Sequence, residues 1–353
     1  MSTGRFTVFR ASTSVIVTFA ALLGAAEPPV WKQLPPLPDP LGVAAPFAGV
    51  ADGALLVAGG ANFPNGLPWN GGKKVWHDQV WLLDRPDGTW RVAGKLPRSL
   101  AYGVSVTTPE GVVCVGGSDA ERHYAATFLL TWKSGKLVIE TLASLPLPLA
   151  NAGGALAGKT IYVAGGARQP GEQAASSRVF AMSLAAKRPR WREIQPMPGK
   201  ARILPIAAAH NGAFFIFGGV ALEPDATGKV TRVYLRDAWR FRDNEGWKRL
   251  ADLPKTLAAA PSPAPIANGV ALLFAGDDGS KIGFQPIEKH PGWPHTILSY
   301  DLANDRWSDS GLVPAPRATV PCIAWRGRFV VPGGEVRPGV RSPEVWAMNG
   351  ATP

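Results

Sequence analysis

Short apolar segments that end in two small residues recur along this chain at a nearly constant interval. Examples are ALLVAGG, GVVCVGG and RFVVPGG, and successive closing pairs are 49 to 58 residues apart. That interval is close to the kelch repeat of about 50 residues, and brief apolar runs bounded by glycine are typical of buried strands. In chain order, the closing pairs are Gly59-Gly60, Gly116-Gly117, Gly165-Gly166, Gly218-Gly219, Gly276-Asp277 (where Asp replaces the second glycine) and Gly333-Gly334.

Two more strand-like segments follow each closing pair. The first has an aromatic or apolar centre, as in QVWLLD and EVWAM, and the second often begins with Trp and ends at Pro, as in GWKRLADLP. The segment VWKQLPPLP, around Trp31, has this second form but precedes the first repeat, and nothing equivalent follows Trp346. We therefore predict an all-β, six-bladed kelch-type β-propeller, closed by an N-terminal strand that completes the C-terminal blade.

The repeat also predicts where the polar loops gather. In an antiparallel four-stranded blade the second and fourth strands run in the same direction, so the loops that follow them share one face. The loops after Gly60, Gly219 and Asp277 are the longest, as expected of walls or lids around a pocket. The polar residues expected on this face include Asn62, Lys74, His77, Arg98, Arg122, Arg202, Arg317, Glu335, Arg337 and Arg341.

Arginine is prominent among these loop residues. Its planar guanidinium binds carboxylates through paired hydrogen bonds, so a ring of arginines around the axis is expected to hold an anionic ligand near a loop carboxylate. A structural ion pair is the alternative interpretation of any carboxylate that lies among arginines.

The first 26 residues differ from the repeat. Arg5 and Arg10 give a positive start, Ser14 to Leu23 are mostly apolar, and Gly24-Ala25-Ala26 offers small residues for cleavage. We predict a signal peptide over residues 1–26 and a propeller over residues 27–353, in a periplasmic or secreted protein. An uncleaved anchor is the alternative, although the apolar stretch is short for a membrane span, and no other segment could form one.

Charge and cysteine content exclude several functions. The formal net charge of +11 comes from 37 basic and 26 acidic residues; because these are spread along the chain without a Lys/Arg run, we expect no nucleic-acid binding. Cys114 and Cys322 lie in apolar strand-like segments and are expected to be buried thiols. The five His have no metal-binding spacing and no nucleotide-binding motif is present, so neither a metal nor a cofactor is expected.

Several segments resemble the sialic-acid mutarotases, the N-acetylneuraminate epimerase family of kelch propellers. The similar segments are GVADGALLVAGGANFPNG, NGGKKVWHDQVWLL, LPRSLAYGVSV and the C-terminal GEVRPGVRS. The order of these blocks resembles that of a cyclically permuted branch of the family, in which the propeller ring is opened at a different blade.

The resemblance implies an activity and a site. It implies interconversion of the anomers of N-acetylneuraminate or a related anionic sugar, with Glu335 and Arg341 as the active-site acid and arginine. In that case Glu335 exchanges protons during ring opening and closure, while Arg341, with Arg337, Arg202 or Arg317, holds the substrate carboxylate. A non-catalytic propeller that binds a protein or an anionic glycan remains an alternative, as does a different glycan-active enzyme such as an oxidase or lyase. The oligomeric state is not predicted.

Overall fold

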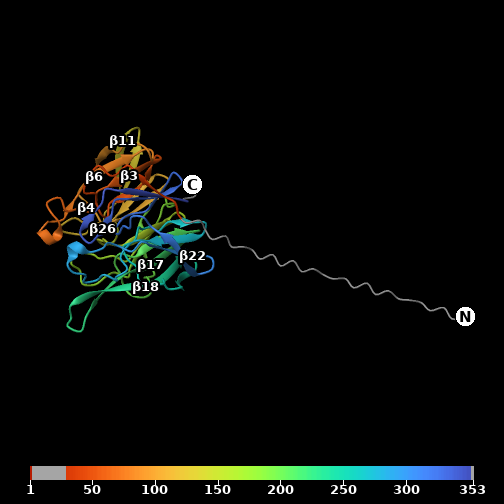
Figure 1. Ribbon diagram of the computed structural model, residues 1–353. Coiled ribbons are helices and arrows are strands. Elements are labelled where there is room, and N and C mark those ends of the chain that lie inside the picture. The colour runs from red at the N-terminus through yellow and green to blue at the C-terminus, as the bar shows by residue number, and fades with distance from the viewer. Residues whose placement is uncertain (2–28, 351–353) are drawn as a thin grey trace.

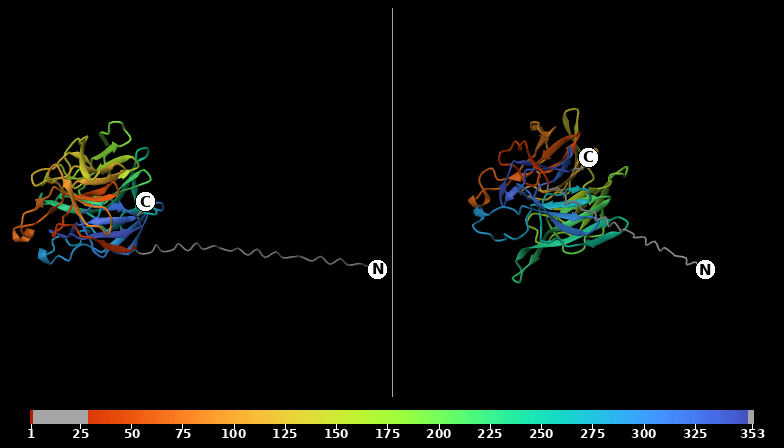
Figure 2. Two further views of the ribbon diagram at one scale, coloured as in Figure 1. Left: turned by 90° about the horizontal axis from the view of Figure 1, so that it is seen from above. Right: turned by 45° about the vertical axis from the view of Figure 1, so that its right-hand side comes forward.

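A computed structural model describes Met1 and residues 29–350, which form six four-stranded antiparallel sheets around one axis (Figures 1 and 2). The first blade contains β2 (Phe47–Ala51), β3 (Ala54–Ala58), β6 (Gln79–Leu83) and β7 (Arg91–Lys95). The second contains β8 (Val104–Thr108), β9 (Gly111–Val115), β10 (Thr127–Lys133) and β11 (Lys136–Leu142). The third contains β12 (Gly153–Ala157), β13 (Thr160–Ala164), β14 (Val179–Ser183) and β15 (Trp191–Ile194).

The remaining blades follow the same order, except where the chain closes on itself. The fourth blade contains β16 (Ile206–His210), β17 (Ala213–Pro224), β18 (Val230–Arg242) and β19 (Gly246–Leu250). The fifth contains β20 (Ile266–Ala267), β21 (Val270–Phe274), β22 (Thr296–Asp301) and β23 (Arg306–Leu312). The sixth contains β24 (Ile323–Trp325), β25 (Arg328–Pro332), β28 (Val345–Asn349) and β1 (Trp31–Leu34).

The predicted closure of the ring is confirmed. Strand β1 pairs antiparallel with β28, with Trp31 opposite Met348 and Leu34 opposite Val345. The first strands contact one another from the sixth blade round to the fifth, and a core cluster that includes Phe274 and Phe329 joins the fifth blade to the sixth, so every sheet packs between two others. The all-β, six-bladed architecture predicted from the repeat is therefore observed.

Tryptophans at the outer strands join consecutive blades. The indole N–H groups of Trp247 and Trp307 donate to carbonyls just beyond the outer strand of the preceding blade, at 3.1 Å and 2.9 Å. In the first blade Trp90 donates in the same way to the carbonyl of Pro35, at 2.8 Å, directly after the closing strand β1. The recurrent Trp thus also fastens the junction where the N-terminus completes the ring.

The glycine pairs are required by close approach to the next blade. Gly59 has a φ of 67°, and a Cβ atom there would lie 2.3 Å from the carbonyl oxygen of Leu100. In the fifth blade the equivalent pair is Ala275-Gly276 rather than Gly276-Asp277, because Gly276 N–H makes the bond to the next blade that Gly60 N–H makes in the first. Ala275 adopts the left-handed φ of 57° without being glycine. Our sequence register was wrong here by one residue.

Three further sequence predictions concern the cysteines, the signal peptide and membrane-spanning segments. Cys114 and Cys322 are buried and do not form a disulfide. The predicted signal peptide lies outside the described residues, apart from Met1. Within the described part of the chain, no helix combines the length and apolar character needed to cross a membrane.

Candidate functional site

A closed ring of backbone hydrogen bonds surrounds the propeller axis. One residue from each blade donates its N–H to the carbonyl of the previous residue in the ring, over 2.7 to 3.0 Å, and the last bond returns to the first residue. All six have a φ between 52° and 63°, a left-handed conformation that costs a non-glycine residue about 1 kcal/mol. Its members are Ala45, Tyr102, Asn151, Leu204, Ala259 and Thr319.

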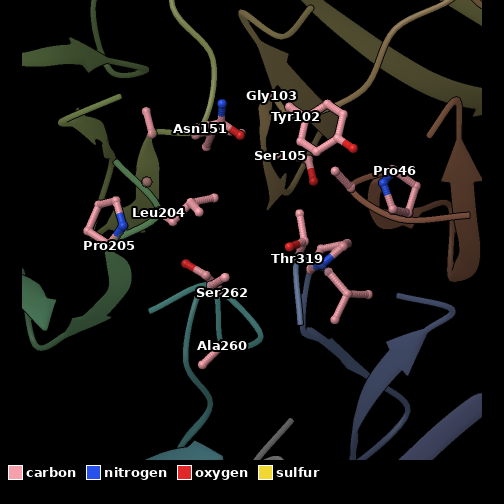
Figure 3. A pocket seen from close by; sticks show the side chains of 17 residues that line it. Pro46, Tyr102, Gly103, Ser105, Asn151, Leu204, Pro205, Ala260, Ser262 and Thr319 are labelled. Atoms are coloured by element: carbon pink, nitrogen blue, oxygen red, sulfur yellow. The ribbon is translucent and has the colours of Figure 1, made fainter. Parts of the chain in front are cut away.

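This ring forms the floor of a cavity of about 480 Å³. The opening on the axis below the ring is surrounded by members of the ring, each from a separate segment of the chain. Figure 3 labels four of them, Tyr102, Asn151, Leu204 and Thr319. The walls come from the loops that follow the glycine pairs, as the strand directions predicted. The volume lies within the range of about 300–1,000 Å³ that is typical of small-molecule sites.

The two longest of these loops lie on the same side of the molecule in all three views (Figures 1 and 2). One carries β4 (Ala61–Asn62), η1 (Pro68–Asn70) and β5 (Val75–Trp76), and the other carries η2 (Ile287–Lys289). The hairpin of β17 and β18 extends well beyond its own blade and contributes Arg232 and Tyr234 to the cavity. The long loops therefore contribute to the cavity walls, as their lengths predicted.

Glu335 and Arg341 meet at the cavity wall. They face each other across a small hairpin of β26 (Glu335–Arg337) and β27 (Val340–Arg341), where Arg341 Nη1 donates to Glu335 Oε1 at 2.8 Å. The backbone N–H of Gly339 donates to the same oxygen at 2.7 Å. Gly339 is required at this turn, because it has a φ of 79° and a Cβ atom there would lie 2.9 Å from Pro68. The carboxylate is held firmly while its residue still lines the cavity.

A second cation, Lys74, lies among aromatic rings at the same cavity. Its Nζ is 4.9 Å from the centroid of Tyr102, 5.5 Å from that of Trp76 and 6.0 Å from that of Phe63. The guanidinium of Arg341 also lies over Phe63, at 4.8 Å. Within residues 29–350 Lys74 has no acidic partner at ion-pair distance, so its charge is available to an anion.

Asp277 is a cavity residue that our sequence interpretation missed. It pairs with Ala258 at the position where Glu335 pairs with Ala318 in the next blade. The hydroxyl of Tyr234 donates to its Oδ2, and the N–H of Gly279 donates to its Oδ1 at 2.9 Å. Burial, followed by the hydrogen bond to Asp277, raises the pKa of Tyr234 well above its ordinary value. Tyr234 is therefore a permanent hydrogen-bond donor at neutral pH.

The second blade contributes Asp119 and His123. Burial opposes ionisation of Asp119, but hydrogen bonds from Tyr124 and from two backbone N–H groups outweigh it and lower the pKa of Asp119. Burial lowers the pKa of His123 and so favours its neutral form. No group of three or more His, Cys, Asp or Glu is arranged to bind a metal ion in the part of the chain that the structure describes.

Two of the predicted binding arginines form ion pairs with acids of the propeller. Arg202 is fully buried, and its two terminal nitrogens donate to the two oxygens of Asp237, each at 2.7 Å. Arg317 donates through one terminal nitrogen to a single oxygen of Glu344 in the sixth blade. Neither arginine lines the cavity. In each pair the acid also accepts a hydrogen bond from a nearby tryptophan, Trp239 or Trp346.

Apart from Lys74, the other predicted binding residues also lie outside the cavity lining. Arg98 stacks on Tyr124, with its guanidinium 4.6 Å from the ring centroid. Asn62 is buried, and its Oδ1 lies 2.8 Å from His77 Nε2, which fixes the start of the long loop of the first blade. Arg122 is exposed on the rim beside Glu121, and Arg337 lies over Trp69 and donates to the carbonyl of Glu288. Of the predicted residues, the structure brings together Lys74, Glu335 and Arg341.

Comparison with known proteins finds sequence similarity in the N-terminal third of the chain. A family model described as "NANM: N-acetylneuraminate epimerase" matches residues 20–139. The chain resembles N-acetylneuraminate epimerases. It is 41% identical over 109 residues to the N-acetylneuraminate epimerase of Yersinia pestis (strain Pestoides F), which covers 28% of this chain and 27% of that protein. It is 42% identical over 130 residues to that of Brucella suis (strain ATCC 23445 / NCTC 10510), which covers 33% of each.

The epimerase-like segment contains Lys74 and ends before Asp277, Glu335 and Arg341. These matches span about a third or less of the relatives' own length. A solved structure titled "Structure of YjhT" covers 89% of this chain and 96% of its own, with a TM-score of 0.65 and 14% identity. That structural similarity supports the propeller fold of the part of the chain that it covers.

Proposed function

We propose that this protein is a mutarotase that interconverts the anomers of N-acetylneuraminate or a closely related anionic sugar. One observation carries the proposal: the axial cavity brings a carboxylate, Glu335, together with two cations, Arg341 and Lys74. The similarity of residues 20–139 to N-acetylneuraminate epimerases supports this choice of substrate class.

The residues of the cavity suit ring opening of a sugar acid. The anomeric carbon of a sialic acid carries both a carboxylate and a hydroxyl, so cations that bind the carboxylate bring the anomeric hydroxyl to the same part of the cavity. Arg341 and Lys74 would bind the carboxylate through charge-assisted hydrogen bonds. Glu335 would then accept the proton of the anomeric hydroxyl as the ring opens, and return it as the ring closes on the other face.

A time course tests this function. Pure α-anomer, released enzymatically from a glycoside, is mixed with the protein, and NMR follows its conversion to the β-anomer. We expect conversion at a rate proportional to protein concentration and faster than in buffer. Saturable binding of the sugar without faster conversion would contradict the proposal and favour a non-catalytic glycan-binding propeller.

Lys74 offers a separate test of how the substrate carboxylate is held. Replacing Lys74 with methionine retains the aliphatic chain that packs among the aromatic rings and removes the charge. A charge-assisted hydrogen bond contributes about 1.5–3 kcal/mol, so we expect KM for the sugar acid to rise about 10- to 100-fold, with a smaller change in kcat. The exposed neighbour Lys73 provides the control, Lys73→Met, which should leave KM unchanged. Equal KM values in the two variants would exclude Lys74 from carboxylate binding.

A further inference from the structure

Only two of the six equivalent positions above the axial ring carry a carboxylate. This position directly follows each glycine-type pair and bridges to the residue before the ring. Ala61, Ser118, Ala167 and Val220 occupy it in the first four blades, whereas Asp277 and Glu335 occupy it in the fifth and sixth. The fold therefore places two carboxylates on adjacent blades, at the same cavity.

The two carboxylates are held in similar ways but by different partners. Each accepts a backbone N–H from a glycine two or four residues later, Gly279 or Gly339. Glu335 is also bound by the Arg341 guanidinium, whereas Asp277 is bound by the neutral hydroxyl of Tyr234. Glu335 Oε2 and the remaining lone pairs of Asp277 accept no hydrogen bond from the described residues, so both acids retain acceptor capacity for a ligand.

Tyr234 reaches Asp277 only because the hairpin of β17 and β18 is extended. Its ring packs directly over Gly279, where a Cβ atom would lie 2.8 Å from the ring. A side chain at position 279 would push the phenol away from the carboxylate. A residue of the fourth blade thus orients an acid of the fifth blade. A carboxylate that only stabilised its own turn would not need a partner from another blade.

We propose that Asp277 is a second catalytic carboxylate, which serves the ring oxygen of the sugar while Glu335 serves the anomeric oxygen, and that Tyr234 positions it. This inference rests on the mutarotase function proposed above. Arg341 and Lys74 hold the substrate carboxylate, and with it the anomeric carbon, on the side of Glu335. Asp277, on the adjacent blade, then faces the ring oxygen.

The proton balance of the two-carboxylate reaction is complete without a co-reactant. The proposed step uses Glu335 in its carboxylate form and Asp277 in its carboxylic-acid form. In ring opening, Glu335 takes the proton of the anomeric hydroxyl, the bond from the anomeric carbon to the ring oxygen breaks, and Asp277 gives its proton to that oxygen. After the bond next to the new ketone rotates, Asp277 takes the proton back as the oxygen attacks the other face. Glu335 then returns its proton to the former carbonyl oxygen, and both acids regain their starting states.

Substitution of Asp277 tests this assignment. Asparagine at position 277 has the size of aspartate, and its one acceptor oxygen can still take the hydrogen bond of either the Tyr234 hydroxyl or the Gly279 N–H, so the site should largely keep its shape and its affinity for the sugar. We expect Asp277→Asn to lower kcat for anomer exchange at least 100-fold, with KM changed less than threefold. We expect the bell-shaped pH profile given by one acid and one base to lose one limb. Tyr234→Phe should lower kcat by about tenfold, with the bell retained and one limb displaced.

The controls separate this inference from the function on which it rests. Asp225→Asn changes an exposed acid at the tip of the same hairpin and should leave rate and pH profile unaltered. Wild-type protein that does not accelerate exchange would overturn both the mutarotase function and this assignment. Wild-type acceleration with an Asp277→Asn variant that retains more than half of kcat and a bell-shaped profile would overturn the role of Asp277 alone.

Discussion

Glu335→Gln is expected to slow anomer exchange by about 10²- to 10⁴-fold, the usual contribution of a positioned acid–base group. Glutamine has nearly the same size as glutamate, and its Oε1 can still accept hydrogen bonds from Arg341 and from the N–H of Gly339. The fold and the sugar affinity should therefore remain. Only the capacity to take and return a proton is removed.

Exchange rates at saturating sugar, measured together with a binding isotherm for each variant, provide the comparison. Glu121→Gln is the control, because Glu121 is an exposed acid on the rim with only a long contact of 3.7 Å to Arg122. A Glu335→Gln protein that binds the sugar and exchanges its anomers as fast as wild type would remove Glu335 from the mechanism.

Loss of the buried ion pair between Arg202 and Asp237 should be the largest single effect on stability. Arg202 has no exposed side-chain surface, and its guanidinium also donates to the carbonyls of Lys200 and Gly218. Arg202→Met would leave Asp237 without its charged partner. Burial opposes ionisation of Asp237, and the hydrogen bonds and charge of Arg202 contribute most to lowering its pKa. We expect the free energy of unfolding to fall by about 3–5 kcal/mol.

Urea denaturation measures this loss, and the exposed Arg122 supplies the control. Arg122→Met should change the free energy of unfolding by less than about 1 kcal/mol, as for most surface pairs. The double variant Arg202→Met, Asp237→Leu should recover part of the loss, because no unpaired charge remains buried. If Arg202 instead binds the substrate, Arg202→Met would unfold at the wild-type urea concentration and show a raised KM.

The repeat could be recognised from sequence because its signals are local. Each signal spans only a few residues: the apolar strands, the glycine pairs and the displaced Trp31 segment. Together they predicted six blades, the closing strand and a common face for the long loops. The direction of the strands predicted that Lys74, Glu335 and Arg341 share that face, and the structure brings these three to one cavity.

The partners of the arginines could not be predicted in the same way. Arg202 and Asp237 are 35 residues apart, and Arg317 and Glu344 are 27 residues apart. The acid and a tryptophan two residues later, in Asp237-Ala238-Trp239 and Glu344-Val345-Trp346, were the available signal for a structural role. A count of arginines on the loops does not reveal which of them are already neutralised by such acids.

Asp277 was missed because the strand register differs by one residue from the sequence pattern. The pattern aligned Asp277 with a glycine, where it read as a departure from the repeat. Ala275 adopts the left-handed conformation of the first glycine, so Ala275-Gly276 forms the pair and Asp277 directly follows it. Asp277 therefore occupies the position that Glu335 occupies in the sixth blade. Hydrogen bonding between blades, which no local motif encodes, fixes that register.

Exchange spectroscopy at equilibrium tests the central claim most directly. N-acetylneuraminate is allowed to reach its final ratio of anomers, and magnetisation transfer between the α and β signals is recorded with and without protein. The account predicts faster transfer in proportion to protein concentration, with the anomer ratio unchanged and no new species. Transfer at the rate of the buffer, with the sugar shown to occupy the cavity, would contradict it.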